Sequence, residues 1–191
     1  MSGEQPRPPE QLDPNNLQNY DLLIPHAEIQ ERISEIAEQI SKDSEGKEVV
    51  AVGILDGAVF FAVDLLRKLQ IENLRIELIG VATYQGTRST ERPVITKSFR
   101  RSIEGKHVLL VEDILDSGVT LDFVQRKLAG NKPASLKTAV LLAKNSEVRK
   151  VDVPVDYVGF ADVQGWVVGY GFDVDGRFRN LSDIYVKKDT R

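Results

Sequence analysis

The segment Val49–Leu55 is an unbroken run of residues without a polar side chain, and valine dominates it. Such a run is typical of a strand that is buried on both faces, as in the middle of a parallel sheet. Apolar residues at helical spacing precede it between Ala27 and Ile40 and follow it between Ala58 and Leu69. This part of the chain is therefore expected to form a helix, a doubly buried strand and a second helix.

The alternation continues beyond this segment. Strands are expected at Arg75–Tyr84, His107–Val111 and Leu136–Ala143, and a helix is expected from about Ser117 to Ala129. Strand, helix, strand, strand, helix, strand is the order of an α/β fold with a largely parallel sheet. We therefore predict this fold class.

Length and the composition of the N-terminus indicate the domain organisation. At roughly 150 residues per domain, 191 residues correspond to about one domain, which we place at residues 21–191. Residues 1–20 are polar and proline-rich, which predicts a disordered tail and not a signal peptide. The longest apolar run without glycine, Ala58–Val63, is far shorter than the roughly 20 residues that span a bilayer. A cytoplasmic protein without a membrane partner is expected.

Composition excludes several kinds of chemistry. The chain has no cysteine, which excludes disulfides, thiolate metal sites and cysteine nucleophiles. Its two histidines, His26 and His107, cannot form a three-histidine zinc site. The net charge of −4 argues against a nucleic-acid partner held by phosphate contacts. Carboxylates, hydroxyls, lysines, arginines and backbone groups must therefore carry the function.

Two stretches do not fit the alternation. Gln85–Arg101 is polar and basic, and a loop of this length inside a domain is often functional, although a solvated excursion is the alternative. Asp152–Ile184 is rich in glycine and aromatic residues. We expect it to form short strands and loops.

The densest chemical signal lies where the expected strand His107–Val111 ends. Glu112 and Asp113 follow it directly, and the turn Asp116–Thr120 leads into the next helix. Ligands bind beyond the carboxyl ends of strands in open α/β sheets, and N–H groups at a helix N-terminus bind phosphate. Helix capping by one residue of the turn is the alternative, but it leaves the two acids at the end of an apolar strand unexplained.

Several separated motifs occur in order between about Ile24 and Val186. They are Gly53–Gly57, Thr83–Tyr84, the acidic segment Val108–Thr120, Leu142–Lys144, Trp166–Tyr170, Gly171–Asp173 and Arg177–Leu181. Together they resemble the type I phosphoribosyltransferases, and among them the hypoxanthine-guanine phosphoribosyltransferases. The resemblance implies a mostly parallel central sheet flanked by helices, with a flexible active-site loop. It also implies a small hood subdomain, made by the N-terminal segment and about residues 152–191.

The resemblance implies a reaction of purine salvage. The 5-phosphoribosyl group of 5-phosphoribosyl 1-diphosphate (PRPP) passes to hypoxanthine or guanine, and pyrophosphate leaves. A related enzyme that prefers xanthine or another base, or a regulator that senses PRPP or a nucleotide without catalysis, is the alternative. Mg²⁺ is the implied cofactor, and a homodimer or homotetramer is the implied assembly.

The same resemblance assigns roles to residues. The ribose and the 5′-phosphate would be bound by Glu112, Asp113, Asp116, Ser117, Gly118, Val119 and Thr120, with Asp116 also the general base near N7 of the purine. The purine would be bound by Lys144, Trp166, Val167 and Asp173. Pyrophosphate would be bound by Leu55, Asp56, Gly57, Thr83, Tyr84 and Arg179. The metal ligands would be Glu112, Asp113 and Asp173. Without the resemblance, Lys144 would be interpreted as a surface charge and Trp166 as core packing.

Two expectations concern the loops beside this site. Tyr84–Lys97 is expected to be mobile in the absence of ligands and to close over the site, excluding water. Asp56 stands where the family usually has lysine, so an anion replaces a cation near a polyanionic substrate. The family often has a non-proline cis peptide here, which would fall at Leu55–Asp56.

Overall fold

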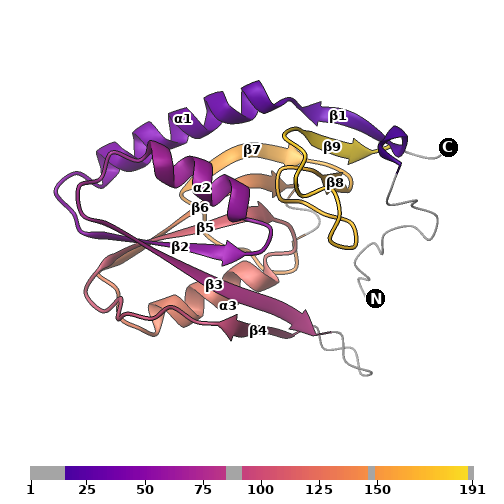
Figure 1. Cartoon of the computed structure of the whole chain (residues 1–191). Helices are drawn as coiled ribbons and strands as arrows, with labels where there is room; N and C mark the ends of the chain where they lie inside the picture. The colour runs from indigo at the N-terminus through magenta and orange to yellow at the C-terminus, as the bar shows by residue number, and fades with distance from the viewer. Residues whose placement is uncertain (1–15, 85–91, 146–148, 189–191) are drawn as a thin grey trace.

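The computed structural model describes residues 16–84, 92–145 and 149–188. Its elements form a large sheet covered by helices and a small sheet beside it (Figure 1). In chain order they are a 3-10 helix (Leu17–Asn19), β1 (Tyr20–Ile24), α1 (His26–Asp43), β2 (Val49–Leu55), α2 (Val59–Lys68), β3 (Leu74–Tyr84), β4 (Arg92–Lys97), β5 (His107–Leu115), α3 (Val119–Ala129), β6 (Ser135–Lys144), β7 (Tyr157–Val163), β8 (Val167–Val168) and β9 (Ile184–Lys187).

The large sheet has the strand order β4-β3-β2-β5-β6-β7. Strand β2 pairs in parallel with β3 and β5, β6 pairs in parallel with β5, and β7 pairs in parallel with β6. Only β4 runs antiparallel in this sheet as described, against β3. The expected α/β fold with a largely parallel sheet is confirmed.

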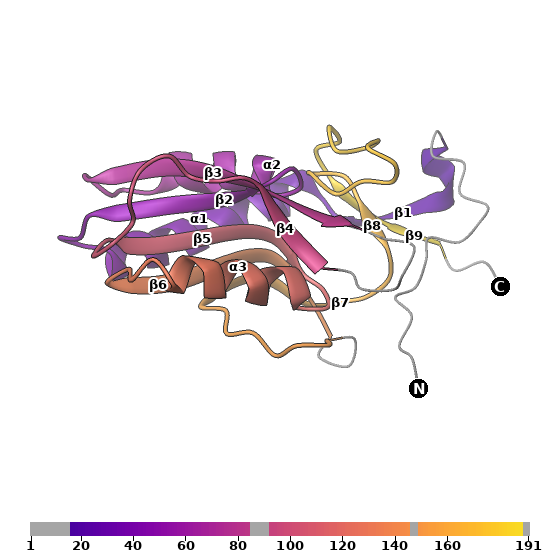
Figure 2. The same ribbon diagram turned by 90° about the horizontal axis from the view of Figure 1, so that it is seen from below.

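The two faces of this sheet explain the unbroken apolar run. Helices α1 and α2 cover one face and α3 covers the other (Figures 1 and 2). In β2, Ala51 belongs to the core cluster that includes residues of α1 and α2, whereas Val50 and Val52 belong to the cluster that includes residues of α3. Successive side chains of a strand point to opposite faces. A strand with helices on both faces therefore needs apolar residues at every position.

The small sheet has the order β1-β9-β8, with both neighbouring pairs antiparallel. It lies beside the carboxyl end of the parallel strands (Figure 1). Strand β7 was expected in this smaller unit, but it extends the large sheet through its pairing with β6. As an edge strand it is only partly buried, so it lacks the unbroken apolar pattern that marks the central strands.

Two further expectations need correction. Arg92–Lys97, expected within an irregular loop, forms the edge strand β4, with Thr83 opposite Pro93 in the pairing. The rest of the expected closing loop, Gln85–Glu91, lies outside the described residues. The tail was expected to reach residue 20, but Tyr20 is buried in β1 and its ring packs edge-on against Phe178.

Among the described residues, the search for a helix long and apolar enough to span a membrane finds none.

Candidate active site

Strand β5 brings two carboxylates to the carboxyl end of the sheet. The strand was expected to end at Val111, but it stays paired with β6 as far as Leu115, so Glu112 and Asp113 lie within it. Glu112 is buried, with 7% of its surface exposed, and its Oε1 accepts a hydrogen bond from the Asp113 backbone N–H at 2.9 Å. A buried acid is thus held inside the sheet.

Burial raises the pKa of both carboxyls, those of Glu112 and Asp113, so both are weaker acids than in water. Burial raises the pKa of Glu112 well above its usual range, and the charge of Asp113 raises it further. Burial also raises the pKa of Asp113, while a hydrogen bond with Glu112 and the positive charge of Arg179 act in the opposite direction. For Glu112 and Asp113 the cost of burial thus outweighs the effect of the neighbouring groups that favour ionisation, and a carboxyl pair with raised pKa values beside a cavity is a candidate functional site.

The turn after β5 forms one wall of a cavity of about 270 Å³. The cavity is lined by Ile54, Leu55, Gly57, Val81, Glu112, Asp113, Ile114, Leu115, Asp116, Ser117, Gly118, Thr120 and Leu121. Helix α3 begins at Val119 and not at Ser117, so Asp116–Gly118 form the loop that leads into it. The first N–H groups of a helix have no partner within the helix, and they are well suited to hold a phosphate.

A neighbouring segment fixes this loop from behind. The Ser117 carbonyl accepts hydrogen bonds from the backbone N–H groups of Lys150 and Val151, at 2.9 and 3.1 Å. Sequence reasoning did not find these two residues, because backbone contacts between distant segments leave no side-chain pattern. The loop is held in place by these contacts before any ligand binds.

The loop between β2 and α2 lies against the acidic pair. The peptide bond Leu55–Asp56 is cis, as the resemblance predicted. A Cβ atom at Gly57 would lie 1.8 Å from the Asp113 Oδ2, so a larger residue at this position would force the Asp113 carboxylate to move. Leu55 and Gly57 line the cavity, whereas the Asp56 side chain is exposed and is not part of the lining.

Lys144, at the end of β6, faces the loop after β5. Its Nζ lies 3.4 Å from the Asp116 Oδ1, and 14% of its side chain is exposed. Trp166 precedes the short strand β8, which begins at the buried Val167, and Trp166 packs against the cluster of Tyr20, Val168 and Val174. The Trp166 Nε1 is buried without a hydrogen-bond partner. The lysine is mostly buried, and the tryptophan packs in the small-sheet cluster.

Asp173 and Arg179 form an ion pair on the loop that connects β8 to β9. The Arg179 Nη2 lies 2.8 Å from the Asp173 Oδ1, and the Arg179 Nη1 donates to the Gly171 carbonyl at 2.5 Å. The Asp173 Oδ2 accepts a hydrogen bond from the Gly176 N–H at 2.7 Å. The same loop packs on the β2–α2 loop beside Asp113, since a Cβ atom at Gly171 would lie 2.1 Å from the Gly57 carbonyl oxygen.

Thr83 and Tyr84 form the end of β3, where the backbone of Tyr84 pairs with that of Arg92. Val81, two residues before Thr83, lines the cavity. The proposed contact of Thr83 and Tyr84 with pyrophosphate stays a prediction.

The oxygen donors at this site suit a magnesium ion that shares a substrate. The described residues contain no group of three or more histidine and acidic side chains that could hold a metal ion. Mg²⁺ is usually bound through one or two carboxylates together with substrate phosphates, and not by a complete protein cage. The carboxylates of Asp173 and of the β5 pair fit that mode of binding.

Comparison with known proteins gives the same answer from three directions. The family model described as "Phosphoribosyl transferase domain" matches residues 20–175. A hypoxanthine-guanine-xanthine phosphoribosyltransferase from Tritrichomonas foetus is 41% identical over 169 residues, covering 88% of this chain and 92% of that protein. A hypoxanthine phosphoribosyltransferase from Salmonella typhimurium is 44% identical over 165 residues, covering 84% and 91% of the two chains.

Solved structures agree with the sequence relatives. The crystal structure of a hypoxanthine-guanine phosphoribosyltransferase from Bacillus anthracis superposes with a TM-score of 0.80 at 38% identity, covering 88% of this chain and 98% of that chain. A hypoxanthine phosphoribosyltransferase from Staphylococcus aureus gives a TM-score of 0.84 at 37% identity, covering 91% and 96%. The chain therefore belongs to the type I phosphoribosyltransferase family, in the group that includes these hypoxanthine and hypoxanthine-guanine phosphoribosyltransferases.

Proposed function

We propose that this protein is a purine salvage enzyme that transfers the 5-phosphoribosyl group of PRPP to hypoxanthine or guanine and releases pyrophosphate. Relatives of about 40% identity over most of the chain carry the names of this activity. The structural observation that supports it best is the 3.4 Å contact between Lys144 and Asp116, which joins the proposed base-binding lysine to the proposed phosphate loop.

The phosphoribosyl group would bind at the end of β5. The N–H groups at the start of α3 and the hydroxyls of Ser117 and Thr120 would hold the 5′-phosphate, since they line one cavity. Glu112 and Asp113 would accept hydrogen bonds from the ribose hydroxyls, for which ionised carboxylates are strong acceptors. This division places an anion at N–H groups and neutral hydroxyls at carboxylates.

The purine would bind between the end of β6 and the small sheet. The Lys144 ammonium would donate to O6, a contact that selects oxopurines over aminopurines because an amino group offers no acceptor there. Asp116 would take the proton from N7 as general base, and Trp166 would stack on the ring. Backbone groups of Val167 and Asp173 would bind the edge of the base.

Pyrophosphate would leave toward the loop between β2 and α2. The backbone of Leu55, Asp56 and Gly57 and the fork of Arg179 would bind it, with Thr83 and Tyr84 at the end of β3. Glu112, Asp113 and Asp173 would hold Mg²⁺, which supplies positive charge to the departing diphosphate. Arg179 would then exchange its present bond to Asp173 for a bond to the diphosphate.

The wider organisation is proposed on the same resemblance. The chain from Tyr20 onward would act as one functional unit in the cytoplasm, as a homodimer or homotetramer. Light scattering on the purified chain measures the assembly directly.

The decisive experiment is a PRPP-dependent assay with hypoxanthine, guanine, xanthine and adenine in parallel. We expect turnover of hypoxanthine or guanine with release of pyrophosphate, and no turnover of adenine. Turnover of adenine without hypoxanthine would overturn the role of Lys144, and no turnover of any base would favour the non-catalytic regulator. Xanthine is included because the relative from Tritrichomonas foetus is named for all three oxopurines.

A further inference from the structure

Tyr170 connects the loop of the small sheet to the helices of the large sheet. It follows β8, only 3% of its surface is exposed, and its hydroxyl donates to the Asp64 Oδ2 of α2 at 2.6 Å. The Gln30 Nε2 of α1 donates to the same oxygen at 2.6 Å and lies 3.3 Å from the Tyr170 hydroxyl. One side chain of the loop is thus bonded to a residue of α2 and lies within reach of a residue of α1.

The backbone at Tyr170 is held in an uncommon conformation. Its φ is +51°, in the left-handed region that residues with a side chain rarely adopt. Such a conformation persists only where the surroundings hold it. Burial and the Asp64 carboxylate also raise the pKa of the Tyr170 hydroxyl, so it remains a donor at any physiological pH.

The residue after Tyr170 presses against the proposed pyrophosphate loop. A Cβ atom at Gly171 would lie 2.1 Å from the Gly57 carbonyl oxygen. Glycine is needed here because the two backbones approach so closely. Since the Gly171 carbonyl also accepts from the Arg179 Nη1, the position of Gly171 is linked to the positions of Arg179 and Asp173.

We propose that Tyr170 is a positioning residue: its bond to Asp64 holds the Gly171–Asp173 loop and Arg179 against Gly57, and thereby sets the affinity for the diphosphate of PRPP. This inference rests on the proposed function, because it assumes that the diphosphate binds at this contact. Because its side chain is buried and its hydroxyl is bonded to Asp64, Tyr170 would act without contacting either substrate. It acts through the position of the next three residues and of Arg179.

The test compares two tyrosines with equivalent hydrogen bonds. Tyr157 donates to the Asp43 Oδ2 at 2.7 Å at the opposite end of the large sheet, away from the cavity. Tyr170→Phe and Tyr157→Phe each remove one hydroxyl bonded to a carboxylate. We expect the KM for PRPP to rise about tenfold in Tyr170→Phe, the order of magnitude of one hydrogen bond to a charged group. The KM for hypoxanthine should change less than about twofold, and Tyr157→Phe should leave both KM values unchanged.

A second readout does not depend on activity. Hydrogen–deuterium exchange of Gly169–Arg179 in the free protein should become faster in Tyr170→Phe and stay unchanged in Tyr157→Phe. Equal KM values for PRPP in the two variants, or unchanged exchange in Tyr170→Phe, would overturn the positioning role. If the wild-type protein turns over no purine at all, the proposed function has failed, and the exchange comparison alone then decides whether Tyr170 positions the loop.

Discussion

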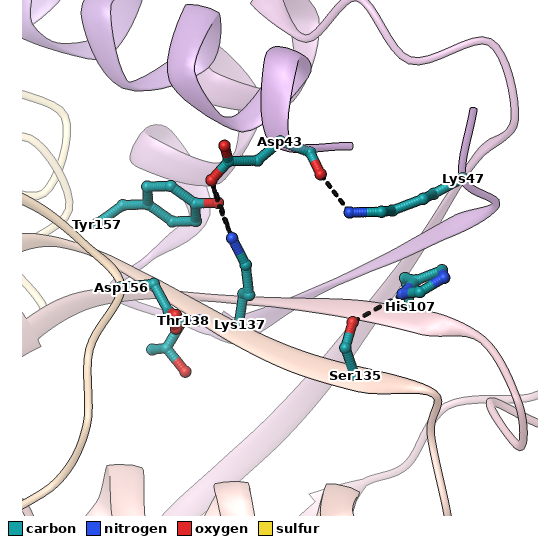
Figure 3. A network of polar contacts seen from close by, with 8 residues as sticks. All are labelled: Asp43, Lys47, His107, Ser135, Lys137, Thr138, Asp156 and Tyr157. Carbon is teal, nitrogen blue, oxygen red and sulfur yellow. Dashed lines mark hydrogen bonds and ion pairs between the residues drawn. The ribbon is translucent and has the colours of Figure 1, made fainter. Parts of the chain in front are cut away.

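Strand β6 carries a lysine near each of its ends, and the two lysines have opposite electrostatic surroundings. At its start, the Lys137 Nζ lies 2.9 Å from the Asp43 Oδ2 and 3.0 Å from the Tyr157 hydroxyl oxygen (Figure 3). The Tyr157 hydroxyl donates to the same carboxylate oxygen. Each of the three groups contacts the other two, so this end of the sheet satisfies its own charges.

The carboxyl end of β6 has no such closed set of three mutual contacts among the groups named here. Lys144 lies 3.4 Å from Asp116, and the adjacent strand β5 places two further acids, Glu112 and Asp113, side by side. Their partners lower the pKa of Asp43 and raise that of Lys137, whereas burial raises the pKa of Glu112. One end of the sheet thus pairs its carboxylate with two donors, whereas the other buries a carboxyl whose ionised form is disfavoured.

The largest expected effect is a difference in kcat between variants of the two aspartate–lysine pairs, Asp116–Lys144 and Asp43–Lys137. Asp116→Asn removes the proposed base while keeping the shape of the side chain, so kcat with hypoxanthine should fall about a hundredfold, the usual contribution of general base catalysis. Asp43→Asn is the matched control at the opposite end and should leave kcat unchanged. Steady-state kinetics at saturating PRPP measures both. Similar kcat values in the two variants would contradict the contrast between the two ends.

The second expected effect is that one substitution, Glu112→Gln, raises the stability of the fold and weakens PRPP binding. Glu112→Gln removes a buried carboxyl whose raised pKa makes its ionised form costly, so the free energy of unfolding should rise by about 1 kcal/mol near pH 8. The sign follows from linkage: an acid whose pKa is raised by folding destabilises the protein as pH rises above its unfolded pKa. The gain should therefore vanish toward pH 4.

The same substitution should weaken PRPP binding about tenfold, because a charged acceptor of the ribose hydroxyls is lost. Urea unfolding at several pH values and the KM for PRPP are the two measurements. A less stable Glu112→Gln protein at pH 8 would show that the carboxylate is already compensated in the free protein.

A smaller effect concerns acid stability at the opposite end. The hydrogen bonds from Lys137 and Tyr157 lower the pKa of Asp43, so its contribution is complete above the usual pKa of aspartate and is lost as pH falls through the lowered value. Wild type should be more stable than Asp43→Asn at neutral pH, and the difference should disappear in strong acid. Because these side chains are partly exposed, the difference should be modest. A constant difference across the whole pH range would contradict this assignment.

The smallest effect is expected at Asp56. The Asp56 side chain is exposed and outside the cavity lining. Because salt screens exposed charges, Asp56→Lys should change the affinity for pyrophosphate less than about twofold at physiological ionic strength. Product inhibition by pyrophosphate measures it. A several-fold tighter inhibition would mean that a longer side chain at this position reaches the substrate, and that the aspartate weakens binding here.

The sequence predicts the parts of this molecule that repeat a simple pattern. The central strands could be located because burial on two faces requires apolar residues throughout. The acids after Val111 interrupt that pattern near the carboxyl end of a central strand, which marks the candidate site. Strands β4 and β7 could not be predicted in the same way, because each is an edge strand with one neighbour. A partly exposed strand such as β7 does not need an unbroken apolar sequence. The contact between Asp64 and Tyr170 joins residues 106 positions apart. Contacts of this kind depend on how the small sheet packs against the large one, which no local pattern encodes.

The small sheet joins the first described strand to the last, because β1 pairs with β9. During synthesis, a chain released as far as Val163 contains every strand of the large sheet and the loop at the start of α3, but not Asp173, Arg179 or β9. Such a chain contains every residue of the proposed phosphate site, whereas its proposed pyrophosphate site lacks Arg179 and its proposed base site lacks Trp166, Val167 and Asp173. Translation therefore supplies the residues of these proposed sites in a fixed order, with those for the sugar phosphate before the last of those for the base and the diphosphate.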